Sequence, residues 1–281
     1  MHWRWGMADE VGDDLIRKLE DGVLWITLNR PDTGNAMTTP MRDQIGDWMI
    51  EASADPWVRV VVLTGAGEKG FCTGAELRSQ RRDPPPKPDG APERIVGDAA
   101  RVIRTGWQRL VASIMDCEKP VIAGVNGTAA GGGMHLALAC DLVVMAEEAR
   151  FIEVFIRRGI APDAGGAYIL TRLVGPQKAK ELFFLGDDVP AAEAHRIGLA
   201  NKVVPRADLE KTLSELAGRL ASAPTKAIAF SKWLTNRSLD SDRITAFWDE
   251  GFAQELISGT ADSTEGMLSF VERRPPEFKG W

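Results

Sequence analysis

The sequence NGTAAGGGMHLALACD, residues 126–141, places three consecutive glycines directly before an apolar segment. It overlaps a stretch, 120–140, that holds no charged residue and is long enough to raise the question of a membrane-spanning helix. Five glycines, Asn126 and His135 within that stretch argue against a spanning helix. The pattern therefore predicts a buried strand, a glycine turn and a buried helix.

The segments on both sides of this turn continue the alternation of strands and helices. Strands are predicted over 23–29, 58–65, 120–127 and 141–147, and helices over 39–54, 101–117 and 132–140. Such alternation is typical of an α/β fold with largely parallel sheets. From Asp208 onward the pattern is helical only, which predicts a C-terminal helical appendage.

These patterns divide the chain into an expected disordered extension over 1–14, an α/β core over 15–205 and a helical region over 206–281. The opening MHWRWGM is too short and too polar for a signal peptide, and Met7 is an alternative start that would make the residues before it an extension. Residues 83–93 hold five of the sixteen prolines without an apolar anchor, so they predict a mobile surface loop.

Composition narrows the class of protein. The chain has 281 residues, 44% hydrophobic and 26% charged, which is enough to bury a full core. A net charge of −6 and a pI near 5.3 argue against a nucleic-acid surface, apart from the short basic stretch 78–82. Cys72, Cys117 and Cys140 lack CxxC spacing, so we expect buried, reduced thiols in a cytoplasmic protein.

A first glycine-rich loop, GAGEKG at 65–70, matches the dinucleotide pattern GxGxxG after a strand. A nucleotide loop should continue directly into a helix, yet FCTG intervenes here. We therefore favour a tight turn after a strand, and we expect no nicotinamide cofactor. No cluster of metal-ligand residues is evident in the sequence, so no metal is expected either.

Two other loops carry more information together than apart. KGFCTGAEL (69–77) and residues 126–141 each place small residues where a strand becomes a helix, so each can present free backbone N–H groups to an anion. Two such donors that face one pocket would form an oxyanion hole. Four further segments complete the pattern: GNAM (34–37), APDAGGAYIL (161–170), AHRIGLANKVV (194–204) and EGMLSFVERRPPEFKG (265–280). With them the chain resembles the enoyl-CoA hydratase/isomerase (crotonase) superfamily over nearly its whole length.

The resemblance implies a spiral of ββα units, assembly into a homotrimer or a dimer of trimers, and a coenzyme A thioester as substrate. It assigns the two oxyanion donors to the backbone N–H groups of Ala75 and Gly132. The other substrate-binding positions that it suggests are Ala36, Lys69, Gly74, Gly131, Phe155 and Lys279. Candidates for contact with coenzyme A phosphates are Arg30, Lys69, the basic stretch 78–82 and Lys279, from its own or a neighbouring subunit; a solvated charged face is the alternative for each.

Hydratases of this superfamily activate water with two glutamates, and the resemblance places those positions at His135 and Phe155. Glu153 is close in sequence, but an offset of two residues changes the direction of its side chain. Both hydratase glutamates are therefore expected to be missing. The addition of water to a simple crotonyl thioester should then be slow.

Asp163, in PDAGG, is the remaining acidic candidate, because it resembles the carboxylate of isomerase-type members that moves a carbon-bound proton. The alternative is that Asp163 caps the helix that follows it. His135 at a helix N-terminus would stay neutral and orient water or contact the acyl group. Its alternative is a core histidine bound to a backbone carbonyl.

Three functions remain open from the sequence. The first is isomerase-like enolate chemistry on an acyl-CoA with Asp163 as base. The second is hydrolysis of a carbon–carbon bond by His135 with Asp163, and the third is non-catalytic acyl-CoA binding. We expect no nucleic-acid or membrane partner. The tryptophans on helices, Trp107 among them, are expected in core or subunit packing.

Overall fold

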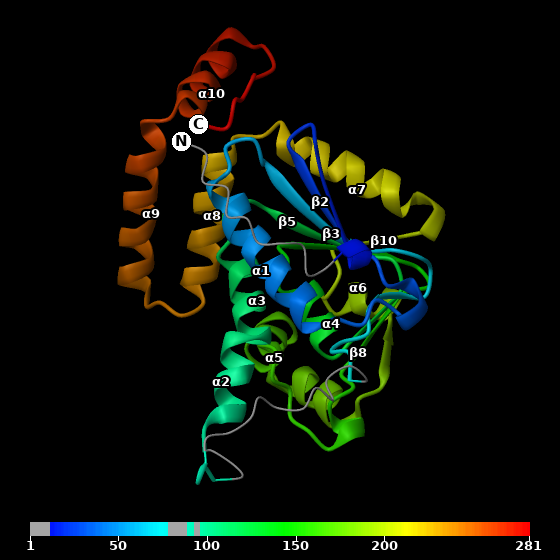
Figure 1. Cartoon of the computed structure of the whole chain (residues 1–281). Helices are drawn as coiled ribbons and strands as arrows, with labels where there is room; N and C mark the ends of the chain where they lie inside the picture. Colours follow the sequence, from blue (N-terminus) through cyan, green and yellow to red (C-terminus); the bar gives the residue numbers. More distant parts are fainter. Residues whose placement is uncertain (1–11, 78–88, 93–95) are drawn as a thin grey trace.

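The computed structural model describes residues 12–77, 89–92 and 96–281, which form two β-sheets enclosed by helices (Figure 1). Most of the expected extension, the basic stretch 78–82 and most of the proline-rich loop 83–93 lie outside the described residues. The last part of the expected extension, Gly12–Asp14, forms a short 3₁₀-helix, η1, that leads into the first strand.

The large sheet contains the predicted strands. Its order is β1 (Leu15–Glu20), β2 (Val23–Leu28), β3 (Val60–Gly65), β5 (Val121–Val125), β7 (Leu142–Ala146) and β10 (Lys202–Val204). β1 and β2 form an antiparallel pair, and every other pair in this sheet is parallel. All five residues of β5 are buried, as expected for a parallel strand covered on both faces.

The small sheet has the order β4 (Gly70–Cys72), β6 (Thr128–Ala130), β8 (Arg150–Ile152) and β9 (Asp188–Pro190). The sequence GAGEKG links β3 of the large sheet to β4 of the small one and leads into no helix. The side-chain amides of Asn35 and Asn126 both donate to the carbonyl oxygen of Gly70, at 2.6 and 3.3 Å. The segment is therefore a short connection between two strands, which agrees with the predicted turn after a strand rather than with a nucleotide loop.

Helix α1 (Thr39–Ala54) has the predicted bounds. It begins after Thr38, whose hydroxyl accepts a hydrogen bond from the N–H of Met41, and a proline in the first turn suits the helix start. The helix predicted over 101–117 is instead two helices, α2 (Asp98–Thr105) and α3 (Trp107–Met115). They are separated by Gly106, whose φ of −101° and ψ of −104° lie outside the helical region.

The glycine turn joins β6 to α4 (Gly132–Leu138), and every residue of α4 is buried. Gly131 adopts φ 54° and ψ −123°, a conformation that favours glycine. A Cβ on Gly133 would lie 2.0 Å from the carbonyl oxygen of Cys72, so the helix packs directly against the backbone at the end of β4. The prediction of a buried helix after the turn is confirmed.

Helix α5 (Gly166–Leu185) is interrupted at Gly175 and Pro176, and α6 (Ala191–Arg196) follows it. Helix α7 (Arg206–Ala221) lies over the large sheet and buries Leu209 and Leu213. Although helical structure begins at 206 as expected, this first helix packs with the α/β core. Two 3₁₀-helices, η2 (Pro31–Thr33) and η3 (Ile156–Arg158), complete the core.

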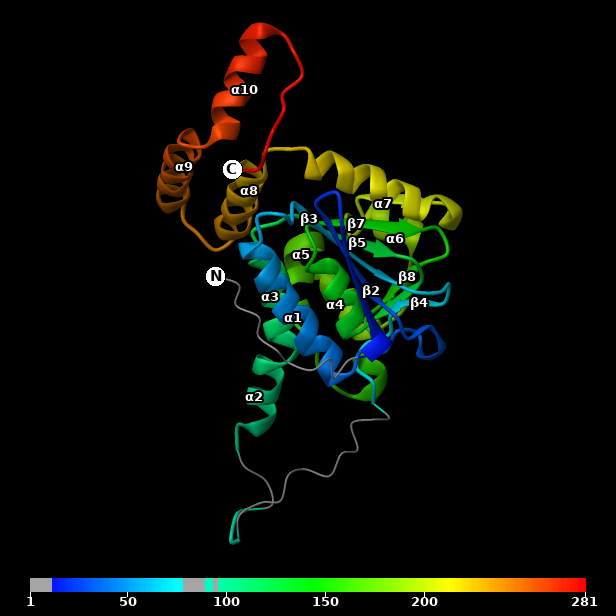
Figure 2. The same ribbon diagram turned by 45° about the horizontal axis from the view of Figure 1, so that its top comes forward.

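Three helices stand apart from the sheets: α8 (Thr225–Ser238), α9 (Arg243–Ser258) and α10 (Ala261–Glu272) (Figure 2). Lys232 joins α8 to the core, because its ammonium group lies 2.8 Å from a carboxylate oxygen of Asp141 and donates to the carbonyl of Ile114. Within the described ranges, none of the helices has the length and apolarity needed to cross a bilayer.

Cys72, Cys117 and Cys140 are buried free thiols, as predicted. Burial raises the pKa of the Cys72 thiol to about 12 and also raises the pKa of Cys140. Because the thiolate is the strong nucleophile, burial disfavours the reactive form of these two cysteines.

Candidate active site

A cavity of about 300 Å³ lies where the glycine turn meets the segment that follows β4. We call it the glycine-turn cavity. Its walls come from four parts of the chain: 73–77, 102–107, 130–132 and 154–163. The described part of the chain thus brings both loops that the sequence predicts as anion-binding elements to a single cavity.

Among the described residues, no backbone acceptor outside the regular elements is found for the N–H groups of Ala75 and Gly132 at this cavity. Met37 and the segment after β4 pair in parallel, since Met37 N donates to Gly74 O at 2.8 Å and Glu76 N donates to Met37 O at 2.9 Å. Successive N–H groups of extended backbone point to opposite sides, so the N–H of Ala75 points away from Met37. Gly132 is the first residue of α4, and its N–H has no acceptor within the helix.

The two turns also approach each other closely. A Cβ on Gly74, which has φ of +94°, would lie 3.0 Å from the carbonyl oxygen of Ala130 and 3.8 Å from the nitrogen of Gly132. Only glycine fits this conformation and this spacing without strain. Gly74, Ala75, Gly131 and Gly132 all border the cavity, and the arrangement can bind an oxygen atom that develops negative charge.

Asp163 borders the same cavity from the loop before α5 and is half-buried. Burial raises the pKa of its carboxyl group, and the nearby His135 ring partly opposes this shift. Helix α5 begins after Gly165 without a capping side chain, so the alternative role of Asp163 as a helix cap is wrong. Gln108 donates to the backbone oxygen of Asp163 at 3.3 Å, which holds the loop in place.

His135 lies elsewhere than expected. Its side chain is fully buried, and its Nε2 lies 2.9 Å from Oε1 of Glu153, which is also buried. Neither side chain borders the glycine-turn cavity. His135 is thus a core histidine, as the structural alternative supposed, but its partner is a carboxylate rather than a backbone carbonyl. A direct role for His135 in catalysis stays a prediction without support from this geometry.

Phe155 separates this pair from the cavity. Its ring stacks on the His135 ring with a centroid distance of 5.2 Å and an angle of 18°, and it also borders the cavity. Glu153 follows β8 directly, whereas Phe155 has helical φ and ψ at the start of η3. This change of backbone conformation explains why an offset of two residues places the two side chains differently.

Three positions suggested by the resemblance do not border the cavity within one chain. Ala36 is buried, and its carbonyl accepts a hydrogen bond of 2.7 Å from Arg30. Lys69 is exposed in the turn between β3 and β4. Lys279 is exposed after α10, where its N–H donates to Asp262 at 2.7 Å. Contact of these residues with substrate stays a prediction.

Sequence reasoning missed several side chains that border the cavity, Arg42, Trp107 and Arg158 among them. Ring atoms of Trp107 lie 2.8 to 3.0 Å from the position that a Cβ on Gly132 would take, so the indole ring packs directly on the glycine turn. The break at Gly106 starts the helix on which this ring sits, and apolar periodicity did not reveal that break.

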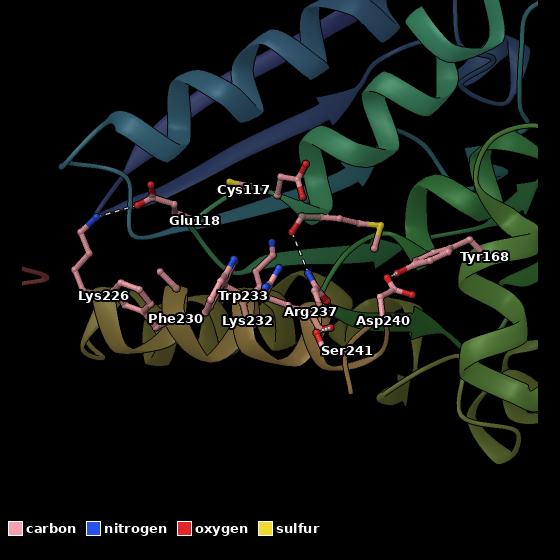
Figure 3. A pocket seen from close by; sticks show the side chains of 14 residues that line it. Cys117, Glu118, Tyr168, Lys226, Phe230, Lys232, Trp233, Arg237, Asp240 and Ser241 are labelled. Carbon is pink, nitrogen blue, oxygen red and sulfur yellow. Dashed lines mark hydrogen bonds and ion pairs between the residues drawn. The ribbon is translucent and has the colours of Figure 1, made fainter. Parts of the chain in front are cut away.

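A larger cavity of about 730 Å³ lies between α8 and the end of α3 (Figure 3). Several of its polar groups are already paired. Lys226 lies 2.9 Å from Glu118, Asn236 donates to the carbonyl of Met115, and the Tyr168 hydroxyl donates to Asp240 at 2.5 Å. These contacts hold α8 against the core. Neither of the two loops with the predicted N–H donors, 69–77 and 126–141, borders this cavity. The glycine-turn cavity is therefore the better candidate for chemistry.

The sequence profile of the enoyl-CoA hydratase/isomerase family matches residues 18–281. The chain belongs to this family. It is 34% identical to the 1,2-epoxyphenylacetyl-CoA isomerase of Escherichia coli (strain K12), with 95% of this chain and 98% of that protein covered. It is 35% identical to the crotonyl-CoA hydratase of Syntrophomonas wolfei, with 95% and 98% covered.

Solved structures of family members agree with this fold. An enoyl-CoA hydratase from Bacillus anthracis superimposes with a TM-score of 0.84 at 34% identity, covering 95% of this chain and 100% of that one. An enoyl-CoA hydratase/isomerase from Cupriavidus metallidurans CH34 gives a TM-score of 0.85 at 33% identity, covering 96% and 97%. The predicted crotonase-type α/β fold is confirmed, and the protein is an enzyme of this lyase and isomerase family.

Proposed function

We propose that the protein is an isomerase-like enzyme that stabilises the enolate of an acyl-CoA thioester in the glycine-turn cavity. The thioester oxygen accepts hydrogen bonds from the N–H groups of Ala75 and Gly132. As the enolate forms, negative charge develops on this oxygen, and each fixed donor can lower the barrier by about 3 kcal/mol. The observation that carries the proposal is that both donor loops and Asp163 border one cavity.

Asp163 acts as the base in this proposal. Its carboxylate takes a proton from the carbon next to the thioester and returns it to another carbon of the same conjugated system, so no group is gained or lost. Burial supports the role, because a carboxylate with a raised pKa is a stronger base than one in water. No metal ion and no nicotinamide take part.

Phe155 favours proton transfer over water addition. It occupies the cavity wall where the resemblance places a hydratase glutamate, and an apolar ring can neither accept nor donate a proton. The hydrolase alternative requires His135 at the substrate, whereas its ring lies behind Phe155. No observation therefore favours carbon–carbon bond hydrolysis.

We also propose that α8, α9 and α10 mediate assembly into a homotrimer or a dimer of trimers. Helix α9 exposes an apolar stripe at the spacing of one helix face, formed by Ile244, Phe247, Trp248, Phe252 and Leu256. Apolar exposure continues on α10 at Met267, Leu268, Phe270 and Val271. An apolar surface of this extent is typical of a protein interface.

The experiment that tests the catalytic proposal is exchange of the α-protons of butyryl-CoA in deuterium oxide, followed by mass spectrometry. A catalyst exchanges these protons, whereas a protein that only binds acyl-CoA leaves them in place. Thermal-shift titration tests the ligand class separately. Butyryl-CoA should raise the melting temperature and NAD should not; the reverse result would contradict the proposal.

A further inference from the structure

We infer that the acyl group of the substrate is apolar and carries an aromatic ring, which lies against the side chains of Trp107 and Phe155. The inference rests on the proposed function and deepens it, because it names the class of acyl group for the same cavity. It depends on how these two rings are placed relative to the glycine turn.

Each ring packs against one glycine of that turn. The Trp107 indole lies 2.8 to 3.0 Å from the position of a Cβ on Gly132, and the Phe155 ring lies 3.6 Å from the position of a Cβ on Gly131. In the proposed complex the thioester oxygen is bound at the N–H of Gly132. The first carbons of the acyl chain therefore lie next to the rings of Trp107 and Phe155.

The rest of the wall is largely apolar. Leu77, Val102, Ile103, Val154 and Ile160 border the cavity in addition to the two rings. An acyl group in this space loses its contact with water and gains few hydrogen-bond partners, so an apolar group is favoured. Aromatic pairs contribute about 0.5 to 1.5 kcal/mol beyond their buried area, which favours an aromatic ring over a saturated ring of similar size.

The buried pair behind the cavity fixes the orientation of one ring. Phe155 stacks on the His135 imidazole, and Glu153 holds that imidazole through the contact of 2.9 Å. A ring that is stacked and backed in this way loses little freedom when a ligand binds. The His135–Glu153 pair thus acts as a positioning element for the aromatic wall.

Charged side chains at the cavity define the competing class of ligand. Arg42 is held by Asp43, with atoms 2.8 Å apart, whereas Arg158 is exposed. An acyl group that ends in a carboxylate would use Arg158 but would also approach Asp163 and the apolar wall. We therefore favour the aromatic acyl group, and an acidic acyl group is an outcome of the test.

The test compares four thioesters by isothermal titration: 3-phenylpropanoyl-CoA, 3-cyclohexylpropanoyl-CoA, butyryl-CoA and succinyl-CoA. We expect the phenyl ester to bind about 2- to 10-fold more tightly than the cyclohexyl ester. Trp107→Leu and Phe155→Leu should each bring this ratio close to one and change butyryl-CoA affinity less. Trp57→Leu is the matched control, because Trp57 is 74% exposed and lies outside the cavity.

Equal or tighter binding of the cyclohexyl ester to the wild-type protein overturns the inference without any variant. The inference is also overturned if the wild-type protein binds succinyl-CoA more tightly than the phenyl ester and Arg158→Leu loses this preference. If butyryl-CoA binds and exchanges its α-protons while the phenyl ester shows no preference, the inference fails and the proposed function stands. If none of the four thioesters binds, both fail.

Discussion

Nε2 of His135 and Oε1 of Glu153 lie 2.9 Å apart in the core, 18 residues apart in the sequence, and neither side chain borders the cavity. Among the described residues, Nδ1 of His135 and Oε2 of Glu153 have no hydrogen-bond partner. The pair is therefore satisfied mainly by its own contact. His135, a residue type that is common in catalysis, thus supports the Phe155 ring in this protein.

Removal of one member of this pair should destabilise the protein strongly. We expect Glu153→Leu or His135→Leu to lower the free energy of unfolding by about 3 to 5 kcal/mol, because the other polar group is left buried without its partner. The double variant should lower the free energy of unfolding by less than the sum of the two single variants. Urea denaturation at one protein concentration measures this coupling. Strict additivity would show that the contact contributes nothing.

The rate of α-proton exchange should depend on the ionisation of Asp163. A base must be deprotonated, so the rate should rise with pH through the pKa of Asp163. Because burial raises this pKa, the rise should occur at higher pH than for an aspartate in water. His135→Gln removes the ring that lowers the pKa, so the rise should move to still higher pH.

The matched control for this experiment is His195→Gln. His195 lies on α6, where its Nδ1 contacts the backbone oxygen of Ala200 at 2.9 Å, away from the cavity. It should leave the pH profile unchanged. A shift to lower pH in His135→Gln, or equal shifts in both variants, would contradict the assignment of Asp163 and His135.

Hydration of crotonyl-CoA should be slow in the wild-type protein. Phe155 and the buried His135 leave water without a positioned acid and base at the expected sites, and each such group contributes about 10²- to 10⁴-fold to a rate. Loss of the absorbance of the conjugated thioester measures the reaction. Hydration at a rate typical of enzymes, about 10 s⁻¹ or more, would show that another group activates water.

Assembly should depend on the apolar stripe of α9. We expect sedimentation velocity to show a trimer or a hexamer for the wild-type protein at micromolar concentration, and smaller species for Phe252→Asp. A standard interface buries about 1,600 Å², so a charge at its centre should be costly. Trp57→Asp, an exposed aromatic residue outside these helices, is the control. A stable wild-type monomer would refute the proposed assembly.

The fold was largely predictable because its signals are local. Residues Val60 to Leu63 are β-branched or aliphatic and fully buried, and the Thr-Pro start of α1 marks its first turn. The glycine turn before α4 was also visible, since three glycines between two apolar segments leave few other conformations. Helix α7 is different: its pattern predicts a helix but does not say whether that helix packs on the sheet.

The parts of the site that depend on backbone conformation were predictable, whereas its side-chain contacts were not. Ala75, Gly132 and Asp163 meet at one cavity, and each lies in or beside a glycine-containing turn that the sequence shows clearly. The contact of His135 with Glu153 was not predictable, since it depends on how the tertiary fold places the residue after β8 against α4 rather than on sequence spacing. Trp107 has an ordinary helical position in the sequence, and only the start of α3 at that residue turns it toward the glycine turn.

The central claim is that Asp163 removes the α-proton of a thioester held by the N–H groups of Ala75 and Gly132. Its most direct test is deuterium exchange into butyryl-CoA by the wild-type protein and by Asp163→Asn, with the dissociation constant of each measured in parallel. We expect the variant to exchange at least about 10²-fold more slowly. Its affinity should stay within about 3-fold, because hydrogen bonds from the backbone are unchanged. Exchange by Asp163→Asn at the wild-type rate, or no exchange by the wild-type protein, would contradict the claim.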